Sequence, residues 1–146
     1  MTYHVPFFII SVTNNKGEHD EKALRFILAN FSNAHPVTGR FCGVEEKGVL
    51  IFQHPSIGAN EEIFIRLLGG SIGQQSVLLV DANRRAALLY CNDGRLEELP
   101  GRWQEHKGEP EPGVNYTKTH DGRYWVVGKE APPVFLTVVR DGGRVS

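Results

Sequence analysis

The residue types that most often carry out catalysis are present in this chain, but their spacing does not bring them together. Six histidines and two cysteines are spread over 146 residues, and no two of them stand at a metal-ligand spacing such as His-x-x-x-His or Cys-x-x-Cys. Glutamates occur in three consecutive pairs, so the two side chains of each pair point in different directions rather than into one pocket. The residues concerned are His4, His19, His35, His54, His106, His120, Cys42, Cys91 and the glutamates at 45–46, 61–62 and 97–98. The sequence therefore predicts no catalytic residue, no metal ligand and no cofactor, and it leaves enzyme activity uncertain.

Basic and aromatic side chains are interleaved in the C-terminal third of the chain. The candidate binding residues there are Trp103, Tyr116, Lys118, Arg123 and Trp125. Such a set suits a protein partner or a single-stranded nucleic acid, because aromatic and Arg side chains dominate binding energy and aromatic rings stack on bases. Strand alternation places Arg123 and Trp125 on one face, which we expect to be solvated, with Trp125 partly exposed. The alternative is that both tryptophans cover the sheet edge and its core.

Motifs for a nucleotide or RNA ligand are incomplete. A phosphate-binding loop follows a strand and opens a helix, whereas the glycine-rich segment 69–73 follows a predicted helix and opens a predicted strand. The segment 47–52 begins Lys-Gly like an RNA-recognition strand, but Val49 and Ile51 stand where aromatic rings would stack on bases. We expect a helix end and a turn at the first segment, and a buried strand in the second.

The charge balance gives little support for nucleic-acid binding. The chain has 16 Lys and Arg against 17 Asp and Glu, so no bulk attraction to a duplex is expected. Residues 117–146 hold five basic side chains against three acidic ones, which is a weak footprint for phosphate. Binding to a single strand therefore stays an alternative and not the leading hypothesis.

The pattern of apolar residues predicts the elements that must position any site. Continuous β-rich runs predict buried strands, and apolar stripes with helical spacing predict two helices, the first capped by Asp20. The order through Val80 is β-α-β-β-α-β, so we expect an α+β fold with a ferredoxin-like core and a C-terminal antiparallel β extension. The predicted strands are 7–13, 40–44, 49–52, 76–80, 86–91, 96–99, 123–127 and 134–139, with a turn at 45–48, and the apolar face of the second helix is Ile63, Phe64, Leu67 and Leu68.

The chain is of a length typical for one domain, and it can bury enough surface to fold without a disulfide or a metal. We expect residues 1–146 to form a single domain. Its core would span 5–100, a segment rich in Gly, Pro and Glu at 105–113 resembles a linker, and the C-terminal β extension would span 116–140.

The N-terminal apolar run is short and has neither a basic flank nor a cleavage site, so it does not predict a signal peptide. No stretch approaches the ~18 apolar residues that cross a bilayer. Cys42 and Cys91 lie in apolar, strand-like segments, and we expect both to be buried, reduced thiols. These observations favour a cytoplasmic protein without a membrane partner.

Three segments resemble a family of small bacterial and phage proteins of unknown function. They are Ile9-Ile10-Ser11-Val12-Thr13-Asn14, Val49-Leu50-Ile51 and the run from Ile72 to Val80. The family pattern is roughly Ile-Thr-Ala-x-Asn, then Ser-Phe-Leu-Val, then Phe-Gly-Gln-x-Ala-Val, and its Trp-Asn-Pro is replaced here by Thr13-Asn14-Asn15. The resemblance covers about residues 7–90. It implies an accessory protein of a phage or a bacterium, acting in the host cytoplasm if phage-encoded, and it assigns no catalytic residue.

The leading hypothesis is a small non-enzymatic interaction protein that binds a host macromolecule, most simply a host protein. It depends on the lack of an assembled catalytic constellation and on the aromatic and basic residues left over. The first alternative is a single-stranded nucleic-acid-binding protein that uses the same residues. The further alternative is an enzyme whose site is dispersed over loops. The oligomeric state is left open.

Overall fold

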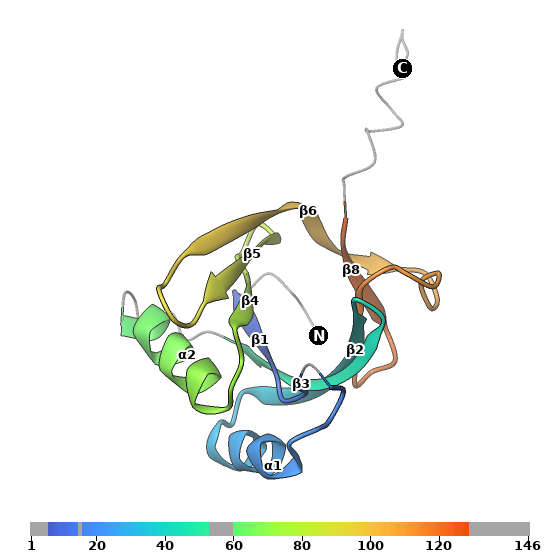
Figure 1. Cartoon of the computed structure of the whole chain (residues 1–146). Helices are drawn as coiled ribbons and strands as arrows, with labels where there is room; N and C mark the ends of the chain where they lie inside the picture. The colour runs from blue at the N-terminus through green and yellow to red at the C-terminus, as the bar shows by residue number, and fades with distance from the viewer. Residues whose placement is uncertain (1–5, 15, 53–59, 129–146) are drawn as a thin grey trace, which may run out of the picture.

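The computed structural model describes residues 6–14, 16–52 and 60–128, and its elements alternate between strands and two helices (Figure 1). The predicted strand at 134–139 and the end of the predicted extension lie outside these residues. The elements are β1 (Phe7–Ser11), α1 (Glu21–Asn30), β2 (Ala34–Phe41), β3 (Val44–Phe52), α2 (Asn60–Ser71), β4 (Ser76–Val80), β5 (Arg85–Tyr90), β6 (Leu96–His106), β7 (Tyr116–Thr119) and β8 (Tyr124–Gly128). Neither helix is long and apolar enough to cross a membrane, within the residues described.

The eight strands form one closed barrel in which every pair of neighbours is antiparallel. Their order around the barrel is β1-β3-β2-β7-β8-β6-β5-β4. The predicted ferredoxin-like α+β fold is therefore wrong. The expected edge extension does not end the sheet, because β7 pairs with β2 while β8 pairs with β6, and these pairings close the ring.

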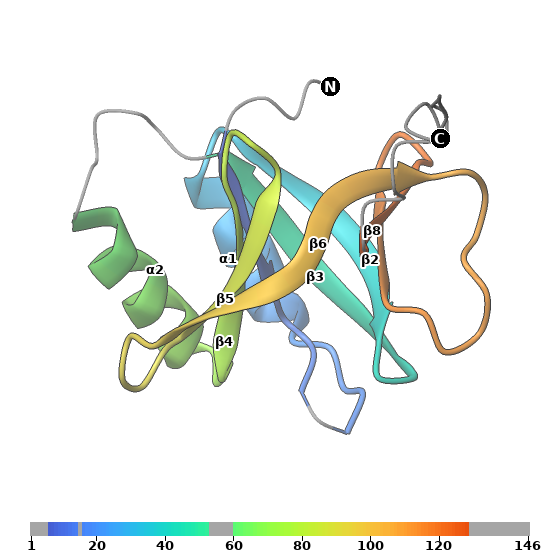
Figure 2. The ribbon, with the colours of Figure 1, turned by 90° about the horizontal axis from the view of Figure 1, so that it is seen from above.

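The long strand β6 makes the closure possible. Its first residues pair with β5 and its last residues pair with β8, so it passes from one half of the barrel to the other (Figure 2). The register with β5 shifts between Arg85 and Ala87, and Gly101 has a φ of 96°. A bulge of this kind bends and twists a strand, which here curves the sheet round on itself.

Side chains alternate between the inside and the outside of the barrel, and this divides the core into two clusters. On β1, Phe7 and Ile9 point into the barrel, whereas Phe8 and Ile10 lie under the helices on its outer face. The helix α1 packs against β2 and β3, and α2 packs against β4. The inner cluster is Phe7, Ile9, Val37, Leu50, Val80, Ala86, Trp103 and Trp125.

The first helix is confirmed and the apolar face of the second is corrected. Asp20 caps α1 by accepting a hydrogen bond from the Ala23 backbone N–H at 3.0 Å. On α2 the buried side chain is Ile65, with Leu68 partly buried beside it. Among the strands α2 packs chiefly against β4, so only a narrow stripe of the helix is covered. The predicted face residues Ile63, Phe64 and Leu67 are exposed.

The turn between β2 and β3 lies at residues 42–43 and not at the predicted 45–48. Phe41 pairs with Val44, and the two residues between them have φ values of 51° and 81°. Two-residue hairpin loops of this hand match the twist of the strands, and Gly43 supplies the left-handed conformation. Cys42 is therefore exposed at a hairpin tip, and the expectation that it is buried is wrong.

Candidate functional site

The end of the barrel where β1 finishes and β4 begins holds a cavity of about 500 Å³. Its rim is polar and its walls deeper down are apolar. This volume falls within the range of about 300–1,000 Å³ that is typical of small-molecule sites. The polar lining residues are Ser11, Thr13, Asn14, Glu46, Gln74, Gln75, Ser76 and Asn115, and the apolar ones include Ile9, Phe41, Leu78 and Leu88.

Glu46 is the only carboxylate among the described residues that line this cavity. Its side chain is half-buried, and burial raises the pKa of its carboxyl group above the ordinary value. A hydrogen bond with Ser11 and the nearby His19 act in the opposite direction on this pKa. The site therefore carries a single, partly desolvated negative charge that a cation would stabilise.

Thr13 fixes one side of the rim through its backbone and its hydroxyl. Its Oγ1 accepts a hydrogen bond from the Lys47 backbone N–H at 2.9 Å and lies 2.7 Å from Nδ1 of His19. Its carbonyl accepts a hydrogen bond from the side-chain amide of Gln74 at 3.1 Å. Since Thr13 is buried, these contacts tie β1, β3 and the segment before β4 together next to Glu46.

The opposite side of the rim is formed by the connection between β6 and β7. Arg40, on the outer face of β2, donates from Nη2 to the carbonyl oxygens of Pro110 and Glu111 at 3.2 and 2.9 Å. Its guanidinium also lies over the ring of Tyr116, 4.8 Å from the centroid. These contacts hold the connection beside the hairpin tip, where the Cys42 backbone N–H donates to Oδ1 of Asn115 at 2.9 Å.

A second, apolar pocket of about 260 Å³ lies next to the first. The two share Phe41, Leu78, Leu88 and Asn115 in their linings. The apolar pocket is also lined by Trp103 and Trp125, whose rings stack at 5.7 Å with an interplanar angle of 9°. The remaining lining residues are Leu99, Pro100, Tyr116, Thr117, Val126 and Val127.

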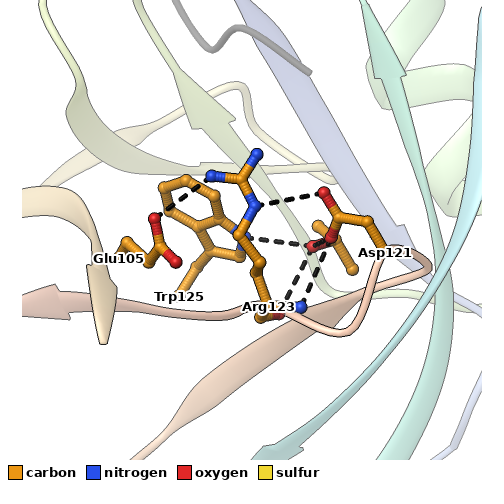
Figure 3. A network of polar contacts seen from close by, with 5 residues as sticks. Glu105, Asp121, Arg123 and Trp125 are labelled. Atoms are coloured by element: carbon orange, nitrogen blue, oxygen red, sulfur yellow. Dashed lines mark hydrogen bonds and ion pairs between the residues drawn. The ribbon is translucent and has the colours of Figure 1, made fainter. Parts of the chain in front are cut away.

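The predicted exposure of Trp125 is wrong. Trp103 is 1% exposed and Trp125 is 4% exposed, because barrel closure turns their shared face into the interior. Arg123 does share a face with Trp125, as strand alternation predicts, and its guanidinium lies 5.3 Å from the centroid of that ring. It is held there by Asp121 and Glu105 at 3.2 and 3.1 Å (Figure 3).

The network around Arg123 closes off the tryptophan side of the barrel. The indole N–H of Trp125 donates to Oγ1 of Thr119 at 3.1 Å, and Thr119 donates in turn to Asp121 at 2.5 Å. This hydrogen bond from Thr119, together with the contacts to Arg123, lowers the pKa of Asp121 to about 2. The network therefore stabilises this side of the barrel, and none of its residues lines the cavity with Glu46.

The five predicted binding residues do not form one surface. Tyr116 is half-buried beneath Arg40 and against Tyr124, with ring centroids 5.3 Å apart. Lys118 is exposed on the outside of the barrel, with its ammonium 5.3 Å from the centroid of Tyr124. A role for any of the five residues in binding a partner stays a prediction.

Sequence reasoning missed the polar residues of the cavity. Ser11, Glu46 and Asn115 stand alone in the sequence, with no motif around them. One signal was available on β1, where the inward series Phe7, Ile9, Ser11 changes from apolar to polar at its last member. Such a change marks the level at which the interior of a barrel meets water.

An eight-stranded barrel is wide enough either to fill its interior with side chains or to hold one small ligand, and here side chains fill one side while a polar cavity lies at the other. A comparison with protein-family models gives a named family, because the model of the S-adenosylmethionine lyase family matches residues 11–128. The chain belongs to the S-adenosylmethionine lyase family. A search of curated proteins found no match for it.

The family assignment corrects two further expectations. The resemblance to phage and bacterial proteins of unknown function is wrong, because the match is to a named family over most of the chain. The hypothesis of a non-enzymatic interaction protein is wrong as well, because that family is named for an enzyme, and the nucleic-acid alternative fits no better.

Proposed function

We propose that this protein is an enzyme that cleaves S-adenosylmethionine by a lyase reaction in the cavity that contains Glu46. The family supplies the substrate and the reaction class. The observation that carries the assignment to this cavity is the half-buried carboxylate of Glu46 at the polar rim of an apolar barrel interior.

The charges of the substrate match those of the cavity. S-Adenosylmethionine carries a sulfonium and an ammonium group, so two positive charges lie close together at its amino-acid end. Glu46 is the only carboxylate among the described lining residues, and a cation beside it would offset the energy lost by burying it. Amides and hydroxyls around it, such as Gln75 and Ser76, offer hydrogen bonds to the substrate carboxylate.

The lyase reaction breaks a carbon–sulfur bond without adding water. The electron pair of that bond moves to sulfur, so the sulfonium becomes a neutral thioether. The carbon regains its fourth bond either from an oxygen of the substrate's own carboxylate, or as a double bond when the neighbouring carbon gives its proton to a base such as the Glu46 carboxylate. Glu46 orients the cationic end in this proposal, and the apolar walls formed by Ile9, Leu78 and Leu88 exclude water from the reacting carbon. Exclusion of water is what separates a lyase outcome from hydrolysis at this bond.

The test is a mass balance on purified protein with S-adenosylmethionine. We expect the substrate to disappear and the masses of the first two products to sum to that of the substrate, as measured by liquid chromatography and mass spectrometry. Products that sum to substrate plus water would identify a hydrolase instead. Failure to consume S-adenosylmethionine would refute the proposed function.

Glu46→Gln tests the location of the site. We expect KM for S-adenosylmethionine to rise at least tenfold, because the neutral amide keeps the shape of the carboxylate and loses its charge. The matched control is Glu45→Gln, since Glu45 is exposed and lies next to Glu46 in β3 without lining the cavity. Equal kinetics for the two variants would move the site away from this cavity.

The cytoplasm is the proposed location. We expect Cys42 and Cys91 to be reduced, and the cytoplasm is a reducing compartment. Both thiols are free in the structure.

A further inference from the structure

A groove of about 470 Å³ lies on the outer face of the barrel and shares no lining residue with the cavity that contains Glu46. The helix α1 forms one wall through Leu24, and the turn between β7 and β8 forms the other. Between these walls Pro36 and Gly48 place no long side chain on the sheet, so the floor of the groove is apolar. The volume is in the range of small-molecule sites.

The charged side chains that line the groove are all basic. They are Lys47, Lys118 and His120, and no Asp or Glu is among the described residues that line it. The cavity has the opposite charge, because Glu46 points into it while the next residue of β3, Lys47, points to the outside. The groove therefore attracts an anion, and the cationic end of S-adenosylmethionine does not suit it.

A row of hydrogen-bond donors crosses the sheet at the groove. Thr38 pairs with Lys47 on one neighbouring strand and with Lys118 on the other, so the three side chains lie on one face. This is the outer face, since Val37 belongs to the inner cluster. Neighbouring strands are about 4.8 Å apart, so a carboxylate or phosphate group can reach the Thr38 hydroxyl and an ammonium group together.

Lys118 is the charge in this row that has no acidic partner among the described residues. Lys47 is paired with Glu21, at 2.9 Å between Nζ and Oε2. The ammonium of Lys118 instead lies 5.3 Å from the centroid of the Tyr124 ring. An anion in the groove would therefore give Lys118 an ion pair without breaking one that exists.

His120 adds a further donor at the turn between β7 and β8. Its ring stacks on that of His35, with centroids 5.3 Å apart and an interplanar angle of 10°. Stacking uses the faces of the ring and leaves its nitrogens, which lie on the edge, available to a ligand. The next residue, Asp121, does not line the groove, because its carboxylate is held by Arg123 at 3.2 Å.

We propose that the groove is a second binding site, for a small organic anion with a carboxylate or phosphate head on an apolar body. The head lies against Thr38, Lys118 and His120, and the body covers Leu24 and Pro36. Charge complementarity selects the head, and burial of apolar surface selects the body. The inference goes beyond the proposed function, because it requires neither S-adenosylmethionine nor the cavity with Glu46.

The probe is phenyl phosphate, which joins such a head to an apolar ring. Titration of the full chain, followed by nuclear magnetic resonance, should saturate with a Kd on the order of 1 mM, as expected for a ligand of about ten non-hydrogen atoms. The backbone amides that shift should be those of Thr38, Gly48, Lys118 and Gly122 and their neighbours. Inorganic phosphate and benzyl alcohol each lack one half of the probe and should bind about tenfold more weakly.

Two variants test the residues that bind the head. Lys118→Gln should raise Kd for phenyl phosphate about fivefold, which is the upper range for an exposed ion pair. Thr38→Val keeps the β-branched shape and removes the hydroxyl, so Kd should rise about threefold. The control is Lys107→Gln, because Lys107 is exposed in the connection between β6 and β7 and does not line the groove. Circular dichroism confirms that each variant is folded.

The outcomes separate this inference from the proposed function. Equal Kd for Lys118→Gln and Lys107→Gln, or shifts at the cavity with Glu46 in place of the groove, would overturn the inference. Inorganic phosphate that binds as tightly as phenyl phosphate would identify an adventitious ion only and would overturn it too. Phenylacetate is the carboxylate counterpart of the probe, and the tighter of the two identifies the head that the site prefers. None of these results bears on consumption of S-adenosylmethionine, which tests the proposed function by itself.

Discussion

Replacing Arg40 should loosen the rim of the cavity while the barrel stays folded. Arg40 lies outside the barrel and does not line either pocket, yet its guanidinium holds two carbonyl oxygens of the connection that carries Asn115. The side chain is 19% exposed. Arg40→Ala removes these contacts together with the stacking on Tyr116, and it releases residues 107–115 from β2.

The expected loss of stability is about 2 kcal/mol. Hydrogen bonds from a charged donor contribute about 1.5–3 kcal/mol each when buried, but released carbonyls of Pro110 and Glu111 would regain water, so the net loss is smaller. The stacking adds about 0.5–1 kcal/mol, and the exposed ion pair with Glu109 at 3.9 Å adds almost nothing. In the other direction, Nε of Arg40 is buried with no partner among the described residues, which costs free energy in the folded state. Replacing Arg40 removes this cost.

Urea unfolding of Arg40→Ala is the assay for stability, with Arg25→Ala as the control because Arg25 is exposed on α1. A loss of 2 kcal/mol corresponds to a decrease in melting temperature of about 8 °C at this chain length. Hydrogen exchange should be faster within residues 107–115 and unchanged in β1. Stability and exchange equal to those of Arg25→Ala would refute the assignment of Arg40 as the residue that holds the rim.

Three further outcomes are expected. Ile51→Ala should lower the free energy of unfolding by about 2–5 kcal/mol, because Ile51 is buried in the cluster beneath the helices; a urea titration with a loss below 1 kcal/mol would contradict this. Asp121 has a pKa of about 2 against an ordinary 3.8, so its ionised carboxylate stabilises the folded protein above pH 4, and this contribution is lost as the pH falls from about 4 to 2. The free energy of unfolding of Asp121→Asn should therefore fall less than that of the wild-type protein over this pH range. Curves of unfolding free energy against pH that run parallel for the two proteins would refute this. Thiol alkylation should modify exposed Cys42 faster than Cys91, whose pKa is raised by burial, and S-adenosylmethionine should protect Cys42; peptide mass spectrometry that finds equal rates would contradict the assignment.

The sequence predicted local elements better than their assembly. The strands β1, β3, β4 and β5 and the start of α1 follow from apolar runs and one cap, which are properties of neighbouring residues. The apolar pattern predicts β2 only at its end, from residue 40 onward. In the structure Pro36 lies within β2, opposite Val49.

Closure of the barrel could not be predicted from local patterns. It depends on pairs far apart in the sequence, such as Thr38 with Lys118 and Trp103 with Val127, and on a bulge in the pairing of β6. The same closure also determines which residues line the cavity. It buries the two tryptophans that an open sheet would have left at an edge, and it brings Glu46 and Asn115 to one cavity.

The tryptophan stack and the network of Arg123 fill one side of the barrel, so a substrate in the cavity with Glu46 would enter and leave by the same rim. Two fragments of one substrate must then leave through the same opening in a fixed sequence, the fragment nearer the rim first. The deeper fragment is the last product bound. It should behave as a competitive product inhibitor, and its departure sets the upper limit on turnover.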